Sequence, residues 1–205
     1  MKEIRVGLIG FGTIGAGVAK ILNNNQEVIE KTLVASVSLV KIADLDIKTD
    51  RGIDIEEGVL TTSVEEVIDN PDIDIVVELI GGYEPARTFL LNAINNKKHV
   101  VTANKALLAK HGDELFELIE EKGLALGFEA SIAGAIPIIR SIRESFVANR
   151  IHILEGIVNG TANYILSKMS DENCDFDVAL KEAQEKGFAE ADPVSYTHLT
   201  LPTKA

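Results

Sequence analysis

The chain has 205 residues, of which 46% are apolar and 25% charged, a balance typical of a globular protein with one or two domains. Its net charge of −12 argues against nucleic acid and anionic membrane surfaces as partners. A single cysteine, Cys174, excludes an intrachain disulfide, and the first residues lack the pattern of a secretory signal. We therefore expect a cytoplasmic protein.

The first fifteen residues predict a dinucleotide site. Residues 4–9 form a short apolar strand pattern, and the next six residues open an amphipathic helix pattern. In such a G-x-G-x-x-G turn the first glycine permits a tight bend, the second admits a pyrophosphate, and the third lets the helix pack on the strand. The alternative is a tight turn without a ligand. The candidate cofactor-binding residues here are Gly10, Phe11, Gly12, Thr13, Ile14 and Gly15.

Strand and helix patterns alternate through residue 129. We expect further strands at residues 33–43, 73–80, 99–102 and 124–128. Ser63 to Glu66 has the sequence of a helix capping box, and Pro85 suits a first helical turn. Apolar strands that alternate with helices predict a doubly wound parallel sheet of the Rossmann type, in an α/β protein.

Two strand ends carry further candidate cofactor residues. Asp44 ends the second strand, where an acid binds the adenine-ribose hydroxyls and favours NAD, although it could simply cap a turn. Lys41, Lys48 and Arg51 lie near enough in sequence to meet a 2′-phosphate, so the pattern leaves NAD or NADP open. At the end of the third strand, Ile80 and Gly81 allow the backbone to approach the nicotinamide half of the cofactor. The alternative is a plain turn between strand and helix. 

The segment after the strand at residues 99–102 carries a polar cluster. Thr102, Asn104 and Lys105 stand between an apolar strand and an apolar helix, at the sheet edge where ligands bind. A lysine there can donate to a carbonyl or hydroxyl and stabilise developing oxyanion charge. The alternative is a solvated lysine. We take Thr102 and Lys105 as cofactor-binding and Lys105 as catalytic.

Organisation changes after Glu129. The run of small residues at 129–137 holds one carboxylate and exposed carbonyls, which suits a hard cation or a hinge between domains. We expect helices at 138–146, 161–169 and 176–186 and a strand at 150–158. Asn159 and Thr161 suit the binding of a small polar substrate or the capping of a helix. Glu190 suits the binding of an ammonium group or a plain surface position. Residues 194–205 lack acids and resemble a fusion scar.

Together these motifs resemble homoserine dehydrogenase. The matching segments are GFGTIG, VELIGG, TANKALLA, EASIAGAIPII, GIVNGTANYIL and GFAEADP, in that order across residues 4–193. The resemblance implies an NAD(P)-binding Rossmann domain at 1–129, an incomplete α/β substrate and dimerisation domain at 130–193, and a non-native tail at 194–205. It implies interconversion of L-homoserine and L-aspartate 4-semialdehyde, on the route to threonine, methionine and isoleucine, by a homodimer or higher homo-oligomer.

The resemblance also implies individual roles. It places Lys105 against cofactor and substrate, and Glu190 against the amino group of homoserine. It places Asn159, Gly160 and Thr161 at the substrate pocket. It implies a monovalent-cation site for sodium or potassium, built from Glu129 and the carbonyls of Ile132, Gly134 and Ile136.

The sequence departs from this family after the Ala-Asp-Pro triplet. There the family supplies a further aspartate and the lysine usually assigned as proton donor and acceptor, so we expect a truncated enzyme of low or no activity. Two rival hypotheses are a non-catalytic NAD(P)-binding sensor and another Rossmann oxidoreductase such as aspartate-semialdehyde dehydrogenase. The latter needs a nucleophilic cysteine, and Cys174 stands among acids that disfavour its thiolate.

Overall fold

The computed structural model describes residues 2–156, 160–186 and 188. The chain divides into two compact units, an N-terminal unit that ends at Ile132 and a C-terminal unit that begins at Ala133. No helix of the described part combines the length and apolar composition that crossing a membrane requires.

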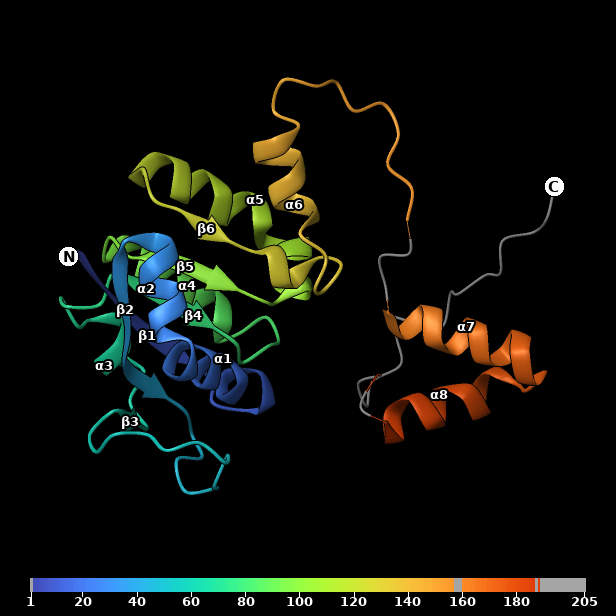
Figure 1. The fold of residues 1–205 in the computed structure, drawn as a ribbon, viewed down its shortest axis with the longest axis horizontal. Helices are drawn as coiled ribbons and strands as arrows, with labels where there is room; N and C mark the ends of the chain where they lie inside the picture. Colours follow the sequence, from blue (N-terminus) through green and yellow to red (C-terminus); the bar gives the residue numbers. More distant parts are fainter. Residues whose placement is uncertain (1, 157–159, 187, 189–205) are drawn as a thin grey trace. The chain divides into compact units, whose positions relative to one another are not determined.

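The N-terminal unit is built on one parallel sheet in the order β3-β2-β1-β4-β5-β6 (Figure 1). This order confirms the predicted doubly wound fold. It reverses between β1 and β4, so a ligand crevice is expected at the carboxyl ends of these two strands. The strands are β1 (Lys2–Ile9), β2 (Ala35–Ala43), β3 (Leu60–Thr61), β4 (Ile75–Glu78), β5 (His99–Thr102) and β6 (Leu126–Gly127).

Helices cover both faces of this sheet. The side chains of β1 alternate, so Leu8 packs with the apolar residues of α1 on one face and Ile9 packs with those of α3 to α5 on the other. Two buried faces explain why the strands are nearly continuous apolar runs. The helices are α1 (Thr13–Asn24), α2 (Gln26–Leu33), α3 (Glu65–Ile68), α4 (Ala86–Asn95) and α5 (Lys105–Lys122), followed by the 3-10 helix η1 (Glu129–Ser131).

Several predicted boundaries were wrong. The strand predicted from residue 33 begins at Ala35, because α2 runs to Leu33 and ends on Val34 in the left-handed conformation (φ 56°). The strands predicted at 73–80 and 124–128 shorten to β4 and β6, and the two-residue β3 was not predicted.

The capping box predicted at Ser63 does not form. Val64 precedes α3, and the Ser63 hydroxyl donates to Glu65 Oε2 at 2.7 Å rather than accepting from the backbone. Glu66 instead accepts from Lys41 Nζ and from the Thr61 hydroxyl, at 2.8 and 2.6 Å. Contacts from β2 and β3 therefore override the local motif.

The described part of the C-terminal unit contains helices and irregular segments. It contains α6 (Ile138–Arg140), which continues as the π-helical turn η2 (Ser141–Ser145), then α7 (Gly160–Glu172) and α8 (Phe176–Glu185). The helices α7 and α8 lie side by side (Figure 1). They enclose a small apolar cluster of buried residues: Ile165, Ala179, Leu180 and Ala183.

The strand predicted at 150–158 is wrong over its described part. Residues 150–156 have no regular structure, and Ile153 is 75% exposed. A strand needs a hydrogen-bonded neighbour, and the described part of the C-terminal unit has no other strand to provide one. The predicted tail at 194–205 lies outside the described residues.

Candidate functional site

The glycine turn connects β1 to α1 and is hydrogen-bonded to the end of β2. Gly10 has a φ of 102° and donates its N–H to the carbonyl of Ala43 at 2.9 Å. A side chain at Gly10 is disfavoured by this φ, and its Cβ would lie 2.9 Å from the backbone of Leu79. The predicted role of the first glycine, a tight turn from β1 into α1, therefore fits the geometry.

The second and third glycines of the turn differ in their surroundings. A Cβ at Gly12 would have no atom within 4 Å, so the space above the first turn of α1 is open. A Cβ at Gly15 would lie 2.0 Å from the carbonyl oxygen of Gly10. Thr13 and Ile14 are exposed in this first turn, whose backbone N–H groups have no partner within the helix. An anionic ligand fits this open end of α1.

Asp44 follows β2 and is tied to the glycine turn. Its Oδ2 accepts the N–H of Phe11 at 2.5 Å, and its Oδ1 accepts the N–H of Asp46 at 2.8 Å. The carboxylate thus stands beside the turn that the sequence predicts to bind the pyrophosphate. Its predicted contact with a ribose stays a prediction.

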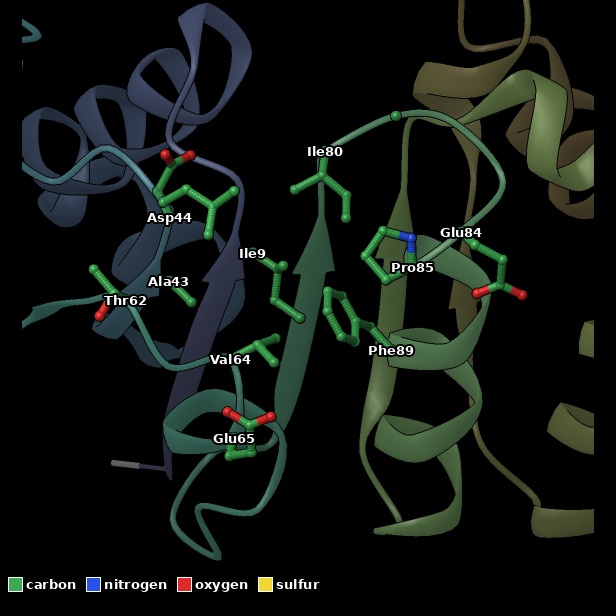
Figure 2. Close-up of a pocket in the computed structure, with 12 residues that line it drawn as sticks. Ile9, Ala43, Asp44, Thr62, Val64, Glu65, Ile80, Glu84, Pro85 and Phe89 are labelled. Atoms are coloured by element: carbon green, nitrogen blue, oxygen red, sulfur yellow. The ribbon is translucent and has the colours of Figure 1, made fainter.

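A pocket of about 530 Å³ lies beside this carboxylate. In Figure 2, Val64 and Phe89 face each other on either side of Ile9, while Asp44 and Ile80 stand at the strand ends. Its walls come from β1, the loop after β2, the segment before α3 and the start of α4. The lining residues are Ile9, Ala43, Asp44, Leu45, Thr62, Val64, Glu65, Ile80, Gly81, Glu84, Pro85 and Phe89.

A buried hydrogen-bond network connects the ends of β4 and β5. Glu78 is fully buried, and its carboxylate accepts the Thr102 hydroxyl at 2.6 Å and the N–H groups of Ile80 and Gly81 at 2.9 and 3.2 Å. The Thr102 oxygen in turn accepts the N–H of Asn104 at 3.0 Å. These contacts offset the desolvation of a buried carboxyl group and fix two predicted cofactor-binding loops to each other.

Asn104 extends this network to Lys105. Its Nδ2 donates to the carbonyl of Gly82 at 2.6 Å, and its Oδ1 caps α5 by accepting the N–H of Leu107 at 3.0 Å. Lys105 is the first residue of α5 and is exposed. The lysine therefore projects from a fixed point at the carboxyl edge of the sheet, beside the Gly81–Gly82 turn.

Two predicted substrate motifs meet in the C-terminal unit. The hydroxyl of Thr161, in the first turn of α7, donates to the carbonyl of Phe188, and the rings of Tyr164 and Phe188 lie 5.1 Å apart. Gly160 begins α7. This brings the segment after α8 against the start of α7. Asn159 and Glu190 lie outside the described residues, so their roles stay predictions.

Ion pairs hold α7 and α8 together. Lys168 lies 2.7 Å from both Glu172 and Glu182, and Tyr164 donates its hydroxyl to Glu182 at 2.7 Å. The hydrogen bond from Lys168, reinforced by Lys186 and Tyr164, lowers the pKa of Glu182 from 4.5 to about 2. The hydrogen bonds of Lys168 with Glu172 and then with Glu182 raise the pKa of Lys168 above its ordinary value of 10.5.

The residues of the predicted cation site fall on both sides of the unit boundary. Glu129 begins η1 and Ile132 ends the N-terminal unit, whereas Gly134 and Ile136 belong to the C-terminal unit. Within the described residues, no three His, Cys, Asp or Glu side chains gather closely enough to hold a metal ion. The carbonyl-based cation site stays a prediction from the resemblance.

Sequence reasoning missed the part that Glu78 plays and the apolar walls of the pocket. A single acid inside the apolar run at residues 75–80 was a signal for the part that Glu78 plays. No local pattern marks the second, because Val64 and Phe89 come from segments that only the fold brings together.

The strand order, the glycine turn at β1 and the pocket at the strand ends define a dinucleotide-binding α/β protein of the Rossmann class. Residues 10–129 match the family model described as "Homoserine dehydrogenase, NAD binding domain", and residues 137–195 match the model described as "Homoserine dehydrogenase". The chain belongs to the homoserine dehydrogenase family.

Individual relatives agree with this assignment. The chain is 48% identical to a homoserine dehydrogenase of Bacillus subtilis over 95% of its own length and 45% of the relative. A crystal structure of a homoserine dehydrogenase from Thiobacillus denitrificans has a TM-score of 0.87 at 50% identity, covering 95% and 45% of the two chains. A hyperthermophilic archaeal homoserine dehydrogenase in complex with NADPH has a TM-score of 0.78 at 27% identity, covering 94% and 64%. The chain thus spans about half the length of the curated relatives it matches.

Proposed function

We propose that this chain carries the NAD(P)-binding unit, and residues of the substrate-binding unit, of a homoserine dehydrogenase. The proposed reaction is the reversible oxidation of L-homoserine to L-aspartate 4-semialdehyde. The observation that carries the proposal is the open first turn of α1, with Gly12 at its start, beside the Asp44 carboxylate and the pocket. This arrangement fits a pyrophosphate, a ribose and an adenine in that order along the edge of the sheet.

The proposal assigns each group a distinct task. The turn residues 10–15 bind the pyrophosphate through backbone N–H groups, and Asp44 accepts from the ribose. The Glu78 network holds Gly81 and Thr102 in place at the nicotinamide end. A nicotinamide held there would supply the acceptor for the hydride that leaves C4 of homoserine as the hydroxyl becomes a carbonyl.

Lys105 is the proposed electrostatic group. An ammonium near the substrate oxygen would donate a hydrogen bond to the alkoxide-like oxygen that forms as the hydroxyl proton passes to the lysine that the family supplies after the Ala-Asp-Pro triplet. The N-cap bond from Asn104 fixes the helix start from which Lys105 projects. In this proposal Asn159, Gly160, Thr161 and Glu190 border the substrate, and Glu129, Ile132, Gly134 and Ile136 hold a monovalent cation. We also propose that the protein forms a homo-oligomer and is located in the cytoplasm.

The test measures homoserine-dependent NAD(P)H formation at 340 nm, with residues 1–193 joined to the C-terminal segment of a family member. We expect Lys105→Ala to lower kcat/KM by about two to three orders of magnitude, the scale of losing one oxyanion donor, with a much smaller change in dinucleotide affinity. Lys122→Ala, at the far end of the same helix, is the matched control and keeps full activity. Dinucleotide binding without homoserine oxidation would support a non-catalytic sensor instead, and normal turnover by Lys105→Ala would move the active site elsewhere.

A further inference from the structure

The turn that follows β4 contains two glycines, Gly81 and Gly82, each with a φ of 72° in the left-handed region. Among the described residues, a Cβ at Gly81 would have no atom within 4 Å, and a Cβ at Gly82 would meet the carbonyl oxygen of Glu84 at 4.0 Å. Packing therefore does not fix this turn. Because glycine backbone is conformationally permissive, hydrogen bonds from outside the turn have to hold it in one conformation.

We propose that Asn104 is a positioning residue that fixes this turn, and with it the nicotinamide half of the cofactor, relative to the start of α5. This inference rests on the function proposed above, in which Gly81 lies at the nicotinamide end and Lys105 acts on the substrate. Asn104 touches neither ligand in this proposal. It acts through the two elements that it joins, so its effect is on the geometry between the hydride acceptor and Lys105.

The two ends of the Asn104 amide bind different elements. Its Nδ2 donates to the carbonyl of Gly82 at 2.6 Å, and its Oδ1 accepts the N–H of Leu107, in the first turn of α5, at 3.0 Å. Since an amide nitrogen donates and an amide oxygen accepts, these two partners determine how the side chain is oriented. A residue that only accepts would keep the helix cap and lose the bond to the turn, so the two tasks of Asn104 are separable.

The backbone of Asn104 is held by the same network as the turn. Its N–H donates to the Thr102 hydroxyl oxygen at 3.0 Å, and the Thr102 hydroxyl donates to Glu78 at 2.6 Å. Glu78 also accepts the N–H of Gly81 at 3.2 Å, so the turn is held at Gly81 from the sheet and at Gly82 from α5. Asn104 is only 8% exposed, so water competes little for its bonds. Without the Asn104 amide the bond to Gly81 persists, and the turn should shift rather than unfold.

The test separates the nicotinamide half of the cofactor from the remainder. ADP-ribose lacks the nicotinamide of NADH, and 2′-phospho-ADP-ribose lacks that of NADPH. In each pair we define the nicotinamide ratio as the dissociation constant without nicotinamide divided by that with it, measured for the chain by nucleotide fluorescence and competition. Asn104→Ser keeps an oxygen that can cap α5 but is too short to reach Gly82. We expect it to lower the nicotinamide ratio about fivefold, the scale of one lost hydrogen bond, and to change the affinity for ADP-ribose by less than about twofold.

Two further variants sharpen the test. Asn104→Asp has the same size and also caps α5, but it faces the Gly82 carbonyl with an oxygen, so it should lower the nicotinamide ratio at least as far. The matched control is Asn96→Ser, at the opposite edge of the sheet, just before β5 begins. It removes an amide that donates to the carbonyl of Ile68 at 3.0 Å and should leave the nicotinamide ratio unchanged.

The outcomes separate a positioning role from a structural one. An unchanged nicotinamide ratio in Asn104→Ser and Asn104→Asp would overturn the inference, as would a ratio of unity in the unchanged chain. An equal loss of affinity within each pair, with a lower midpoint of urea unfolding, would assign Asn104 a purely structural role and overturn the inference as well. Absence of binding of all four nucleotides to the unchanged chain would refute the dinucleotide function itself, which distinguishes that failure from failure of the positioning role.

Discussion

Gly15 and Gly17 lie in the same helix, α1, and the same substitution should affect them in opposite directions. A Cβ at Gly15 would lie 2.0 Å from the carbonyl oxygen of Gly10, whereas a Cβ at Gly17 would have no atom within 4 Å. Real Cβ contacts essentially never fall below 3.0 Å, so Gly15→Ala must open this contact by at least 1.0 Å. The opposing atom is backbone, which cannot rotate away as a side chain would.

The expected magnitudes follow from two terms. Alanine is favoured over glycine within a helix by about 0.5–1 kcal/mol, and this gain applies to both variants. Overpacking against a rigid neighbour costs about 1–3 kcal/mol, and this cost applies to Gly15→Ala alone. Gly17→Ala should therefore stabilise the N-terminal unit by about 0.5–1 kcal/mol. The helix term cancels in the difference between the variants, which isolates the clash at about 1–3 kcal/mol.

Urea unfolding followed by circular dichroism gives the stability of each variant, and NADH titration gives its affinity. Because the clash involves Gly10, displacement of α1 also moves the glycine turn. We expect Gly15→Ala to weaken NADH binding at least about tenfold and Gly17→Ala to leave it unchanged. Equal stabilities and affinities in the two variants would refute the close approach of α1 to the turn, and with it the proposed role of the third glycine.

Two further predictions concern the polar networks. Thr102→Val removes the hydroxyl that donates to Glu78 and accepts from Asn104, so this variant should lose about 2–4 kcal/mol of stability in urea unfolding. Thr102→Ser keeps both hydrogen bonds and should keep most of the stability. Equal unfolding midpoints for the two variants would contradict this network. Glu182 has a pKa lowered from 4.5 to about 2 by Lys168, so its ion pairs stabilise α7 and α8 fully above pH 4.5 and are lost as the pH falls toward 2. Helicity of the chain followed by circular dichroism should decline over that range, and Glu182→Gln should lack this step; an unchanged acid profile in the variant would show that another group is responsible.

The parts of the fold that depend on local pattern were predictable from the sequence. The apolar run at residues 4–9 and the glycines after it predicted β1, the turn and α1, because burial on both faces and a tight bend leave few alternatives. The helix predicted at 176–186 corresponds to α8, because its apolar residues recur with the 3.6-residue period of an α-helix. Boundaries were less predictable, since Val34 ends α2 in a conformation that its residue type disfavours.

Features that depend on distant partners were not predictable. The apolar pattern at residues 150–158 satisfied the sequence criteria for a strand, but strand propensity does not supply a neighbour to pair with. Likewise the motif at Ser63–Glu66 satisfied the criteria for a capping box, but Lys41 and Thr61 attract Glu66 from β2 and β3. In both cases the local signal was present and tertiary contacts, or their absence, decided the outcome.

The candidate site also combines features that were predictable from the sequence with features that were not. Gly81, Thr102 and Lys105 were predicted as site residues separately, each from its own motif, and no motif indicated that they lie together. The parallel register of β4 and β5 places Glu78 directly opposite Thr102, so one buried carboxyl group can bind both loops. A substitution at Glu78 would thus disturb two loops that are proposed to bind the cofactor and lie more than twenty positions apart in sequence, although Glu78 itself is buried beneath them. The assembly of the site is therefore a property of the strand order, and the individual motifs only supply its parts.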